Sequence, residues 1–468
     1  MAMEGPNYLT IEQVAKRLQC SERTVRRWIA DARLVAHRLP GGGYRILESD
    51  LELLLSPNEV IEAPEDNSGF LADGSVTSPQ GFLAGAAYAG IKTYSQDKMD
   101  LGILLSTHAC TSAGTYTTNK FVSPSVTLTK QIVESGSLRG LFVTSGIANA
   151  GVGEQGMIDA IESITLAAEH AGVPADALGI GTTGVIGVEL PMALIRSGIP
   201  NIEMSPDGGN AFARAIMTTD RVPKSSAIKF DLGGTTVTIG GCAKGSGMIH
   251  PNMATMLAYI TTDAAIEESF LRTTLSEVVD DTFNMVTIDG DTSTNDMVVV
   301  MANGAARNNP ISANTPEATL FMNALRTLAN FLARELVRDA EGSNKIFSVR
   351  VDEAQSLSDA RAAAKAIAAS SLVKTAIHGN DPNWGRVIAA AGYSGAELDV
   401  SKVSFFINDV AIMESGFPIA FHRDAVIAIM NNSEVTLSVK LGLGKWSATA
   451  WGCELTASYV QFNSAYTT

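Results

Sequence analysis

The chain has 468 residues, of which 46% are hydrophobic and 42 are glycine. This chain is longer than one ordinary hydrophobic core supports. We therefore expect a small domain plus a large one, or two large lobes. The formal net charge of −15 argues against a protein whose whole surface binds polyanions. Any nucleic-acid contact must therefore be local.

The four cysteines are scattered, so neither a zinc site nor a disulfide framework is indicated. The chain opens with no basic segment followed by an apolar run, and nowhere do about eighteen uninterrupted apolar residues occur. We therefore expect a cytoplasmic protein that neither enters a membrane nor is secreted.

The first residues have the pattern of a small helical domain. Residues 10–13 form a capping box, after which Val14, Ala15 and Leu18 fall on one helical face. Ser21 is a good N-cap for a second helix with arginines on its exposed side. Helix, tight turn and basic helix together are the helix-turn-helix pattern.

A turn at Gly41–Arg45 between short extended runs follows, and residues 49–52 form another capping box. Over residues 8–55 the chain resembles the winged helix-turn-helix of excisionase and MerR-type DNA-binding domains. This resemblance implies a DNA-binding face, for which the candidates are Arg23, Arg26, Arg27 and Arg45. The alternative is a dimerisation or docking module whose arginines are solvated.

The chain divides by composition into three parts. Residues 57–75 carry five acidic side chains and no basic one, which is typical of a linker. We therefore predict a winged helix-turn-helix domain over residues 1–56, an acidic linker over 57–75 and a large domain over 76–468.

Several elements of the large domain are predicted by local pattern. The apolar run Leu101–Leu105 predicts a buried strand. Residues 227–232 and 235–239, separated by two glycines, predict a hairpin that leads the chain to Lys244. Residues 315–338 predict helices rich in alanine and leucine.

Residues 244–257 read Lys-Gly-Ser-Gly-Met-Ile-His-Pro-Asn-Met-Ala-Thr-Met-Leu. The glycines and the proline interrupt both periodicities and predict a loop. A threonine hydroxyl is a weak nucleophile without a base, and the α-amine released by cleavage of the Ala254–Thr255 bond is one such base. By spacing alone, the ordinary interpretation is favoured: a glycine-rich loop that ends in a helix-capping threonine.

Residues 244–264 resemble the self-cleavage segment of the ornithine acetyltransferase family, also called glutamate N-acetyltransferases, and the resemblance runs from about Val76 to Thr468. Members cleave themselves before this threonine. They use it to move an acetyl group from N-acetylornithine to glutamate in the cyclic pathway of arginine biosynthesis. The resemblance implies cleavage between Ala254 and Thr255, with Thr255 as the nucleophile.

The same resemblance implies a fold and an assembly. The fold is a layered α/β sandwich of the ornithine acetyltransferase (DmpA-like, self-cleaving) type. The two cleavage products would be intertwined and paired into a heterotetramer with two copies of each. No cofactor or metal is implied, although acetyl-coenzyme A as a second acetyl donor would add an amino-acid N-acetyltransferase activity.

Roles for individual residues also follow from the resemblance. Thr183 and Gly184 would form the oxyanion hole, which acyl transfer requires because negative charge builds on the carbonyl oxygen. Taken alone, their Thr-Thr-Gly sequence is a common turn. The implied substrate-binding residues are Thr218, Lys244, Thr255, Glu341, Asn463 and Thr468.

The loop at residues 287–296 is rich in carboxylates. Asp289, Asp291 and Asp296 alone could suggest an oxygen-ligated metal. Their spacing does not complete an EF-hand and the family uses no metal, so we expect a hydrogen-bonded scaffold.

Three positions depart from the family's pattern. Thr144 and Ile147 stand where relatives usually carry asparagine, and Arg221 stands where many have a small polar residue. They leave open a related N-acyl amino-acid acyltransferase or amidohydrolase. The amino-terminal pattern leaves open a DNA-binding regulator whose large domain senses arginine precursors, or an enzyme regulated through residues 8–55.

Overall fold

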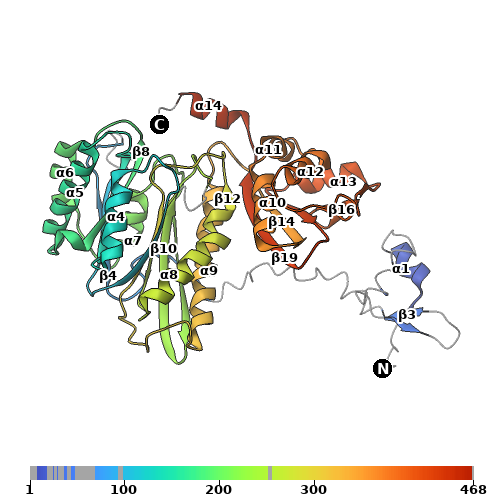
Figure 1. Cartoon of the computed structure of the whole chain (residues 1–468), viewed down its shortest axis with the longest axis horizontal. Coiled ribbons are helices and arrows are strands. Elements are labelled where there is room, and N and C mark those ends of the chain that lie inside the picture. The colour runs from blue at the N-terminus through green and yellow to red at the C-terminus, as the bar shows by residue number, and fades with distance from the viewer. Residues whose placement is uncertain are drawn as a thin grey trace, which may run out of the picture. The chain divides into compact units, whose positions relative to one another are not determined.

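The computed structural model describes residues 8–17, 25, 29, 36–38, 44–47, 69–92, 98–250 and 256–465 (Figure 1). The chain divides into two compact units, Met1–Ser68 and Gly69–Thr468. Within the described ranges, no helix has both the length and the apolar character needed to cross a membrane.

The first unit begins with the predicted capping box. Thr10 Oγ1 accepts the backbone N–H of Gln13, and Gln13 Oε1 accepts that of Thr10. Helix α1 (Ile11–Arg17) follows, and its Val14 and Ala15 are buried. These two predictions are confirmed.

Three short strands complete the described part of this unit, in the order β1-β3-β2. They are β1 Tyr8–Leu9, β2 His37–Arg38 and β3 Tyr44–Leu47. Val25 and Ile46 are buried in its small core. Of the DNA-binding candidates, Arg45 lies on β3 and donates to the Tyr44 carbonyl, whereas Arg23, Arg26 and Arg27 lie outside the described residues.

The second unit contains two sheets that face each other. The four-stranded sheet has the order β4-β5-β7-β8, with strands β4 Phe82–Ala87, β5 Leu101–Ser106, β7 Gly140–Ile147 and β8 Leu178–Val185. The five-stranded sheet has the order β6-β13-β11-β10-β9, with strands β6 Thr111–Tyr116, β13 Met297–Ala302, β11 Leu257–Thr262, β10 Thr235–Lys244 and β9 Lys224–Leu232.

Strand β13 lies between two hydrophobic cores. Its side chains contribute alternately to one core and to the other, because successive side chains of a strand point to opposite faces. Met297, Val299 and Met301 join the core shared with the four-stranded sheet, whereas Val298 and Val300 join the core under helices α8 (Glu268–Asp281) and α9 (Glu317–Arg338). The five-stranded sheet is thus buried on both faces.

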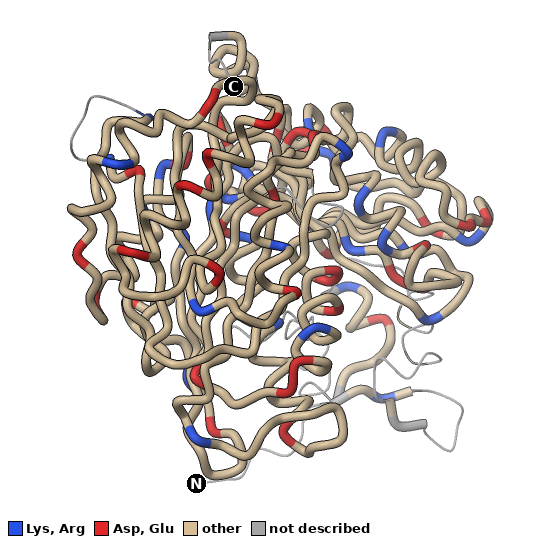
Figure 2. Tube along the Cα trace, turned by 60° about the vertical axis from the view of Figure 1, so that its left-hand side comes forward, with Lys and Arg blue, Asp and Glu red and all other residues tan. Residues whose placement is uncertain are grey.

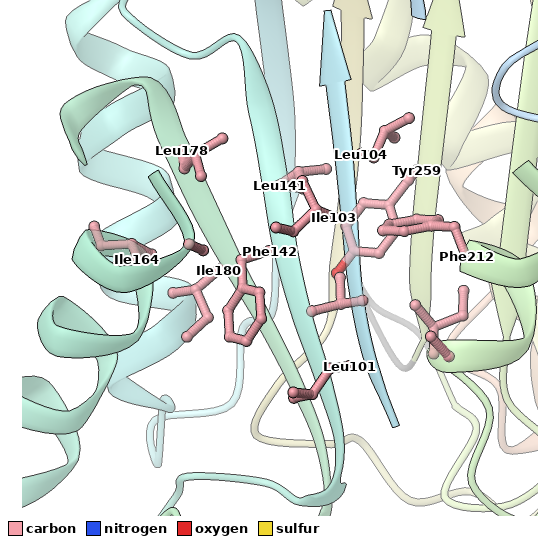
Figure 3. Close-up of a cluster of buried hydrophobic side chains, with 14 of the residues drawn as sticks. Leu101, Ile103, Leu104, Leu141, Phe142, Ile164, Leu178, Ile180, Phe212 and Tyr259 are labelled. Carbon is pink, nitrogen blue, oxygen red and sulfur yellow. The ribbon is translucent and has the colours of Figure 1, made fainter. Parts of the chain in front are cut away.

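Figure 3 shows the first of these cores, in which Tyr259 of β11 and Phe212 lie beside the strands of the four-stranded sheet. The two rings meet edge to face with centroids 5.8 Å apart. A Cβ atom at Gly181 of β8 would lie 1.9 Å from the Tyr259 hydroxyl oxygen. The two sheets therefore touch directly, and the predicted layered α/β sandwich is confirmed.

Helices pack around both sheets (Figure 1). Those of the four-stranded sheet are α4 Pro124–Ser135, α5 Gln155–Ala171, α6 Met192–Gly198 and α7 Gly209–Ala215. Three short 3₁₀ turns occupy Ala175–Ala177, Ile199–Asn201 and Phe283–Met285.

A seven-stranded sheet with its own core forms the rest of the unit. Its order is β12-β19-β14-β18-β15-β16-β17, with strands β12 Val286–Thr287, β19 Trp446–Cys453, β14 Ile346–Ala354, β18 Glu434–Lys440, β15 Ser404–Ile407, β16 Val410–Glu414 and β17 Phe417–Pro418. Its helices are α10 Leu357–Ala369, α11 Ser371–His378, α12 Trp384–Gly392 and α13 Arg423–Met430, and α14 Ala457–Ala465 ends the described chain. Acidic and basic residues are interspersed along the trace (Figure 2).

The local predictions for the large domain are confirmed. The run at Leu101–Leu105 lies in β5, whose residues are all buried. Strands β9 and β10 form the predicted hairpin around Gly233 and Gly234, both at positive φ. Helix α9 covers most of residues 315–338.

Residues 69–75, which composition assigns to the linker, belong to the second unit. Gly69 accepts a hydrogen bond from Lys229 of β9, and Leu71 donates one to Ala227. Composition did not indicate this pairing, because backbone groups rather than side chains make it.

Substituting Gly208 tests how closely α7 packs on β4. A Cβ atom at Gly208 would lie 1.7 Å from the Ala84 carbonyl oxygen, which is backbone and cannot turn away. We expect Gly208→Ala to lower the free energy of unfolding by about 1–3 kcal/mol, as overpacking does. The measurement is urea unfolding, and the control is Gly392→Ala on α12, where a Cβ meets no atom within 4 Å. Equal stabilities of the two variants would contradict this packing.

Candidate active site

A cavity of about 310 Å³ lies in the second unit, a volume that suits a small ligand. Six of the residues selected from sequence line it: Thr183, Gly184, Thr218, Lys244, Glu341 and Asn463. They come from β8, the turn after α7, the end of β10, the loop after α9, and α14. The fold thus gathers residues spread over 281 positions of the sequence, from 183 to 463, at one cavity.

The other predicted residues, Ala254, Thr255 and Thr468, lie outside the described residues. The chain on each side of the first two lines the same cavity, with Met248 and Ile249 before them and Met256 after them. The predicted nucleophile is therefore next in sequence to a residue of the cavity wall.

The end of β8 is built by a close approach of two strands. Gly184 has a φ of +132°, and a Cβ there would lie 2.2 Å from the carbonyl carbon of Gly146 on β7. Only glycine fits this position. The Asn295 side-chain amide ties the two strand ends together by donating to the carbonyls of Ala148 and Thr182.

Lys244 reaches Thr183 across the cavity wall. Its Nζ donates to Thr183 Oγ1 over 3.0 Å, and both residues are 8% exposed. Burial lowers the pKa of Lys244, while the charge of Asp220 acts in the opposite direction. The two side chains thus form one buried polar pair at the cavity.

A buried ionic network lies behind this pair. Lys224 Nζ bridges the carboxylates of Asp220, at 2.5 Å, and Asp339, at 2.6 Å, and all three side chains are at most 4% exposed. Burial would raise the pKa of Asp220, but Lys224 and Lys244 outweigh it and hold this pKa at about 2. Asp220 therefore stays ionised, and it accepts the N–H groups of Gly245 and Thr218.

Asp289 holds the segment before the predicted cleavage point. Its carboxylate accepts the backbone N–H groups of Met248, at 2.6 Å, and Ile249, at 2.8 Å. Met248 has a φ of +55°, a conformation that needs outside support. Tyr459 of α14 donates its hydroxyl to the same carboxylate, so Asp289 connects this segment to the last helix.

Glu341 and Asn463 face each other at the cavity. Asn463 Nδ2 donates to Glu341 Oε2 over 3.0 Å, and the backbone N–H of Glu341 donates to the Ser246 carbonyl. The Glu341 carboxylate packs against Gly247, where a Cβ would lie 2.5 Å from Oε2. A carboxylate placed this way can accept hydrogen bonds from a ligand amine.

The three residues that depart from the family's pattern are not among the described residues lining the cavity. Thr144 is buried on β7, and its hydroxyl has no hydrogen-bond partner within the described structure. Ile147 packs at the edge of the core. Arg221 is 54% exposed and pairs with Asp339.

Sequence reasoning missed Asp220, Lys224, Asn295 and Tyr459, and it treated Asp289 only as part of a polar scaffold. Asp220 and Lys224 carry one local signal, an opposite-charge pair four residues apart that lies close to the predicted Thr218. Asn295 and Tyr459 carry none, because their partners are distant in sequence.

Comparisons with known proteins identify relatives of both parts of the chain. Residues 83–468 match the model of the ArgJ family, and residues 8–58 match that of a helix-turn-helix domain. The chain is 49% identical over 397 residues to the arginine biosynthesis bifunctional protein ArgJ of Symbiobacterium thermophilum, covering 84% of this chain and 99% of that protein.

The protein of the same name from Dehalococcoides mccartyi is 45% identical over 399 residues, covering 85% of this chain and 98% of that protein. Among solved structures, ArgJ of Bacillus halodurans matches at 42% identity with a TM-score of 0.45, covering 45% of this chain and 100% of that chain.

Removing the buried cation tests the ionic network. Lys224→Met leaves Asp220 and Asp339 without their shared partner, and we expect a loss of about 3–5 kcal/mol in the free energy of unfolding. Urea unfolding near neutral pH measures it. Arg196→Met, which breaks an exposed ion pair with Glu162, should leave the unfolding midpoint nearly unchanged. A Lys224→Met variant as stable as the wild type would contradict the assigned charges.

Proposed function

This chain belongs to the ArgJ family, and from that premise we propose that it is a bifunctional enzyme of arginine biosynthesis. Its central activity is that of a glutamate N-acetyltransferase, which moves an acetyl group from N-acetylornithine to glutamate. The proposed carrier of the acetyl group is Thr255.

One observation carries this proposal: the cavity gathers Thr183, Gly184, Lys244 and Glu341 beside Met256, the residue that follows Thr255. These residues supply, in one place, hydrogen-bond donors for an oxyanion, a cation and a carboxylate. An acyl acceptor or donor with both an amine and a carboxylate needs partners of both charges.

Maturation in this mechanism is an acyl shift within the chain. Thr255 Oγ attacks the carbonyl carbon of Ala254, the peptide C–N bond breaks, and an ester forms. Water then hydrolyses the ester, which yields a chain ending at Ala254 and a second chain beginning at Thr255. The new α-amine becomes the general base for Thr255.

Turnover repeats the attack on a substrate. Thr255 Oγ attacks the acetyl carbon of N-acetylornithine, and Thr183 with the Gly184 N–H stabilises the oxyanion. Ornithine leaves with the proton held by the α-amine, and glutamate then takes the acetyl group from Thr255. Acetyl-coenzyme A as an alternative donor would supply the second activity of a bifunctional enzyme.

The sheet explains how two fragments would stay together. Strand β10 precedes the proposed cleavage point and β11 follows it, yet they are antiparallel neighbours from Ile239–Thr262 to Lys244–Leu257. We propose that the fragments remain paired in this sheet and assemble as a heterotetramer with two copies of each. The proposed location is the cytoplasm, where the scattered cysteines would stay reduced.

A related acyltransferase or amidohydrolase for another N-acyl amino acid is the competing enzyme. The positions that motivated it give it little support, because Thr144, Ile147 and Arg221 do not line the described cavity. Rates with N-acetylornithine and a panel of N-acyl amino acids separate the two, and a clear preference outside ornithine would favour the competitor.

Replacing the proposed nucleophile tests both maturation and turnover. Thr255→Ala lacks the hydroxyl that attacks, so we expect one uncut chain and no acetyl transfer to glutamate. Intact mass under denaturing conditions and a transfer assay measure the two results. Thr273→Ala, at an exposed threonine of α8, should yield two fragments and full activity. Two fragments from Thr255→Ala would overturn the assignment.

We propose a second function, DNA binding, for the amino-terminal unit. The match of residues 8–58 to a helix-turn-helix domain supports it, as does the concentration of arginines at positions 23, 26 and 27. The combination describes an enzyme that is localised or regulated through DNA. A regulator without catalysis would not require the cavity residues of an acyltransferase.

Removing these arginines should abolish DNA binding without affecting catalysis. We expect the triple variant Arg23→Gln, Arg26→Gln, Arg27→Gln of the full chain to lose its gel shift with genomic fragments and to keep its transferase rate. The matched control removes three exposed arginines of the large unit, Arg214, Arg272 and Arg423, and should bind as the wild type does. Equal binding by both triple variants would contradict the proposal.

A further inference from the structure

The hydrogen bond between Lys244 and Thr183 fixes the direction in which each group can donate. An ammonium group has three donors and no acceptor, so Thr183 Oγ1 must be the acceptor in the 3.0 Å contact. The hydroxyl proton of Thr183 is therefore left for another partner. Within the described ranges, the hydrogen bond found for the Thr183 hydroxyl is the one that it accepts from Lys244.

The position of Thr183 shows where that proton can go. Thr183 lines the cavity beside Gly184 and is 8% exposed. Its backbone is held by the close approach of β7 and β8, and the neighbouring Thr182 carbonyl is held by Asn295. An oxygen bound in the cavity is thus the acceptor that this geometry offers.

Carboxylates around Lys244 favour its protonated form and oppose burial, which is the largest influence and lowers its pKa. The carboxylate of Asp220 is buried next to it and accepts the N–H of Gly245, the residue after Lys244. Asp296 and Glu341 also act on Lys244 as nearby negative charges, while the positive charge of Lys224 acts in the opposite direction. A cation bonded to a hydroxyl oxygen polarises the O–H bond and strengthens its donation to an anion.

We propose that Lys244 is a positioning residue that acts on catalysis through Thr183: it turns and polarises the Thr183 hydroxyl toward the developing oxyanion. This inference rests on the proposed acetyl transfer and gives Lys244 a role beyond the binding of a substrate carboxylate.

The affected step is the attack on the acetyl group. The bond from Thr255 Oγ to the acetyl carbon forms, the π electrons move onto the carbonyl oxygen, and the Thr255 proton passes to the α-amine. Thr183 O–H donates to that oxygen while the negative charge lasts. When the C–N bond breaks, the electron pair on the oxygen re-forms the C=O bond, and the leaving nitrogen of ornithine takes the proton from the α-amine.

A double-mutant cycle on the full-length, self-processed protein tests the coupling. The variants are Lys244→Met, Thr183→Ala and the double variant, assayed with N-acetylornithine and glutamate. We expect each single variant to lower kcat by roughly 10²–10³-fold, as the loss of an oxyanion donor does. For Thr183→Ala, KM should change less than about threefold, because donation to the oxyanion exists only in the transition state. Lys244→Met should also raise KM, because it loses the proposed contact with a substrate carboxylate. The double variant should be no slower than Thr183→Ala.

Two controls keep the cycle interpretable. Lys229→Met removes an exposed lysine of the neighbouring strand β9 and should leave kcat unchanged. Lys244→Arg retains a cationic donor and should keep more of kcat than Lys244→Met. If Lys244→Met does not fold, Lys244→Arg is compared with and without the Thr183→Ala substitution, and a loss of kcat confined to the protein that keeps Thr183 supports the proposal.

Other outcomes overturn the proposal. In one such outcome, Lys244→Met raises KM but keeps kcat, both in the protein with Thr183 and in the Thr183→Ala variant. Lys244 would then only bind a substrate carboxylate. If the loss of kcat in the double variant equals the product of the losses in the two single variants, Lys244 and Thr183 act independently. A wild-type protein that transfers no acetyl group would overturn the proposed function itself, which distinguishes that failure from the failure of this inference.

Discussion

The candidate site depends on a buried charge balance centred on Asp220. Its carboxylate lies between Lys224 and Lys244, and Lys224 is shared with Asp339 at the end of α9. Isolated ions in a protein interior cost far more than paired ones, so these side chains are held together once the chain folds. Because Asp220 also accepts the N–H groups of Thr218 and Gly245, the same interaction positions two segments of the cavity wall. The site is thereby built onto the junction of β9, β10 and α9.

A second constraint holds the segment around the proposed cleavage point from both sides. Before it, Ile288 donates to the Ile249 carbonyl, and Asp289 accepts the N–H groups of Met248 and Ile249. After it, Met297 donates to the Met256 carbonyl. The short stretch from Ile288 to Met297, the first residue of β13, therefore anchors both ends. Cleavage between those anchors would leave each new end attached to the cavity, where an N-terminal threonine could act as nucleophile and base together.

Elements with a strong local signal were predictable from the sequence. The capping box at Thr10–Gln13, the hairpin around Gly233 and Gly234, and helix α9 each follow from interactions between residues close in the chain. The stacking of the four-stranded sheet on the five-stranded one came from family resemblance alone. Strand patterns state which faces are apolar, but they do not state which strand pairs with which. The pairing of Gly69 and Leu71 with β9 shows the same limit, since it uses backbone groups that every residue has.

For the candidate site, the sequence by itself determined the chemical groups: two threonines, a glycine, a lysine, a carboxylate and an asparagine, and these six residues line one cavity. Only the tertiary structure decided their partners. Lys244 meets Thr183 across 61 positions of sequence, and Lys224 meets Asp339 across 115. A motif records local preferences, whereas the direction of a hydrogen bond and the balance of a buried charge depend on groups that folding brings together. The role of Lys244 toward Thr183 is visible only there, because an ammonium group must donate and the fold selects the oxygen that accepts.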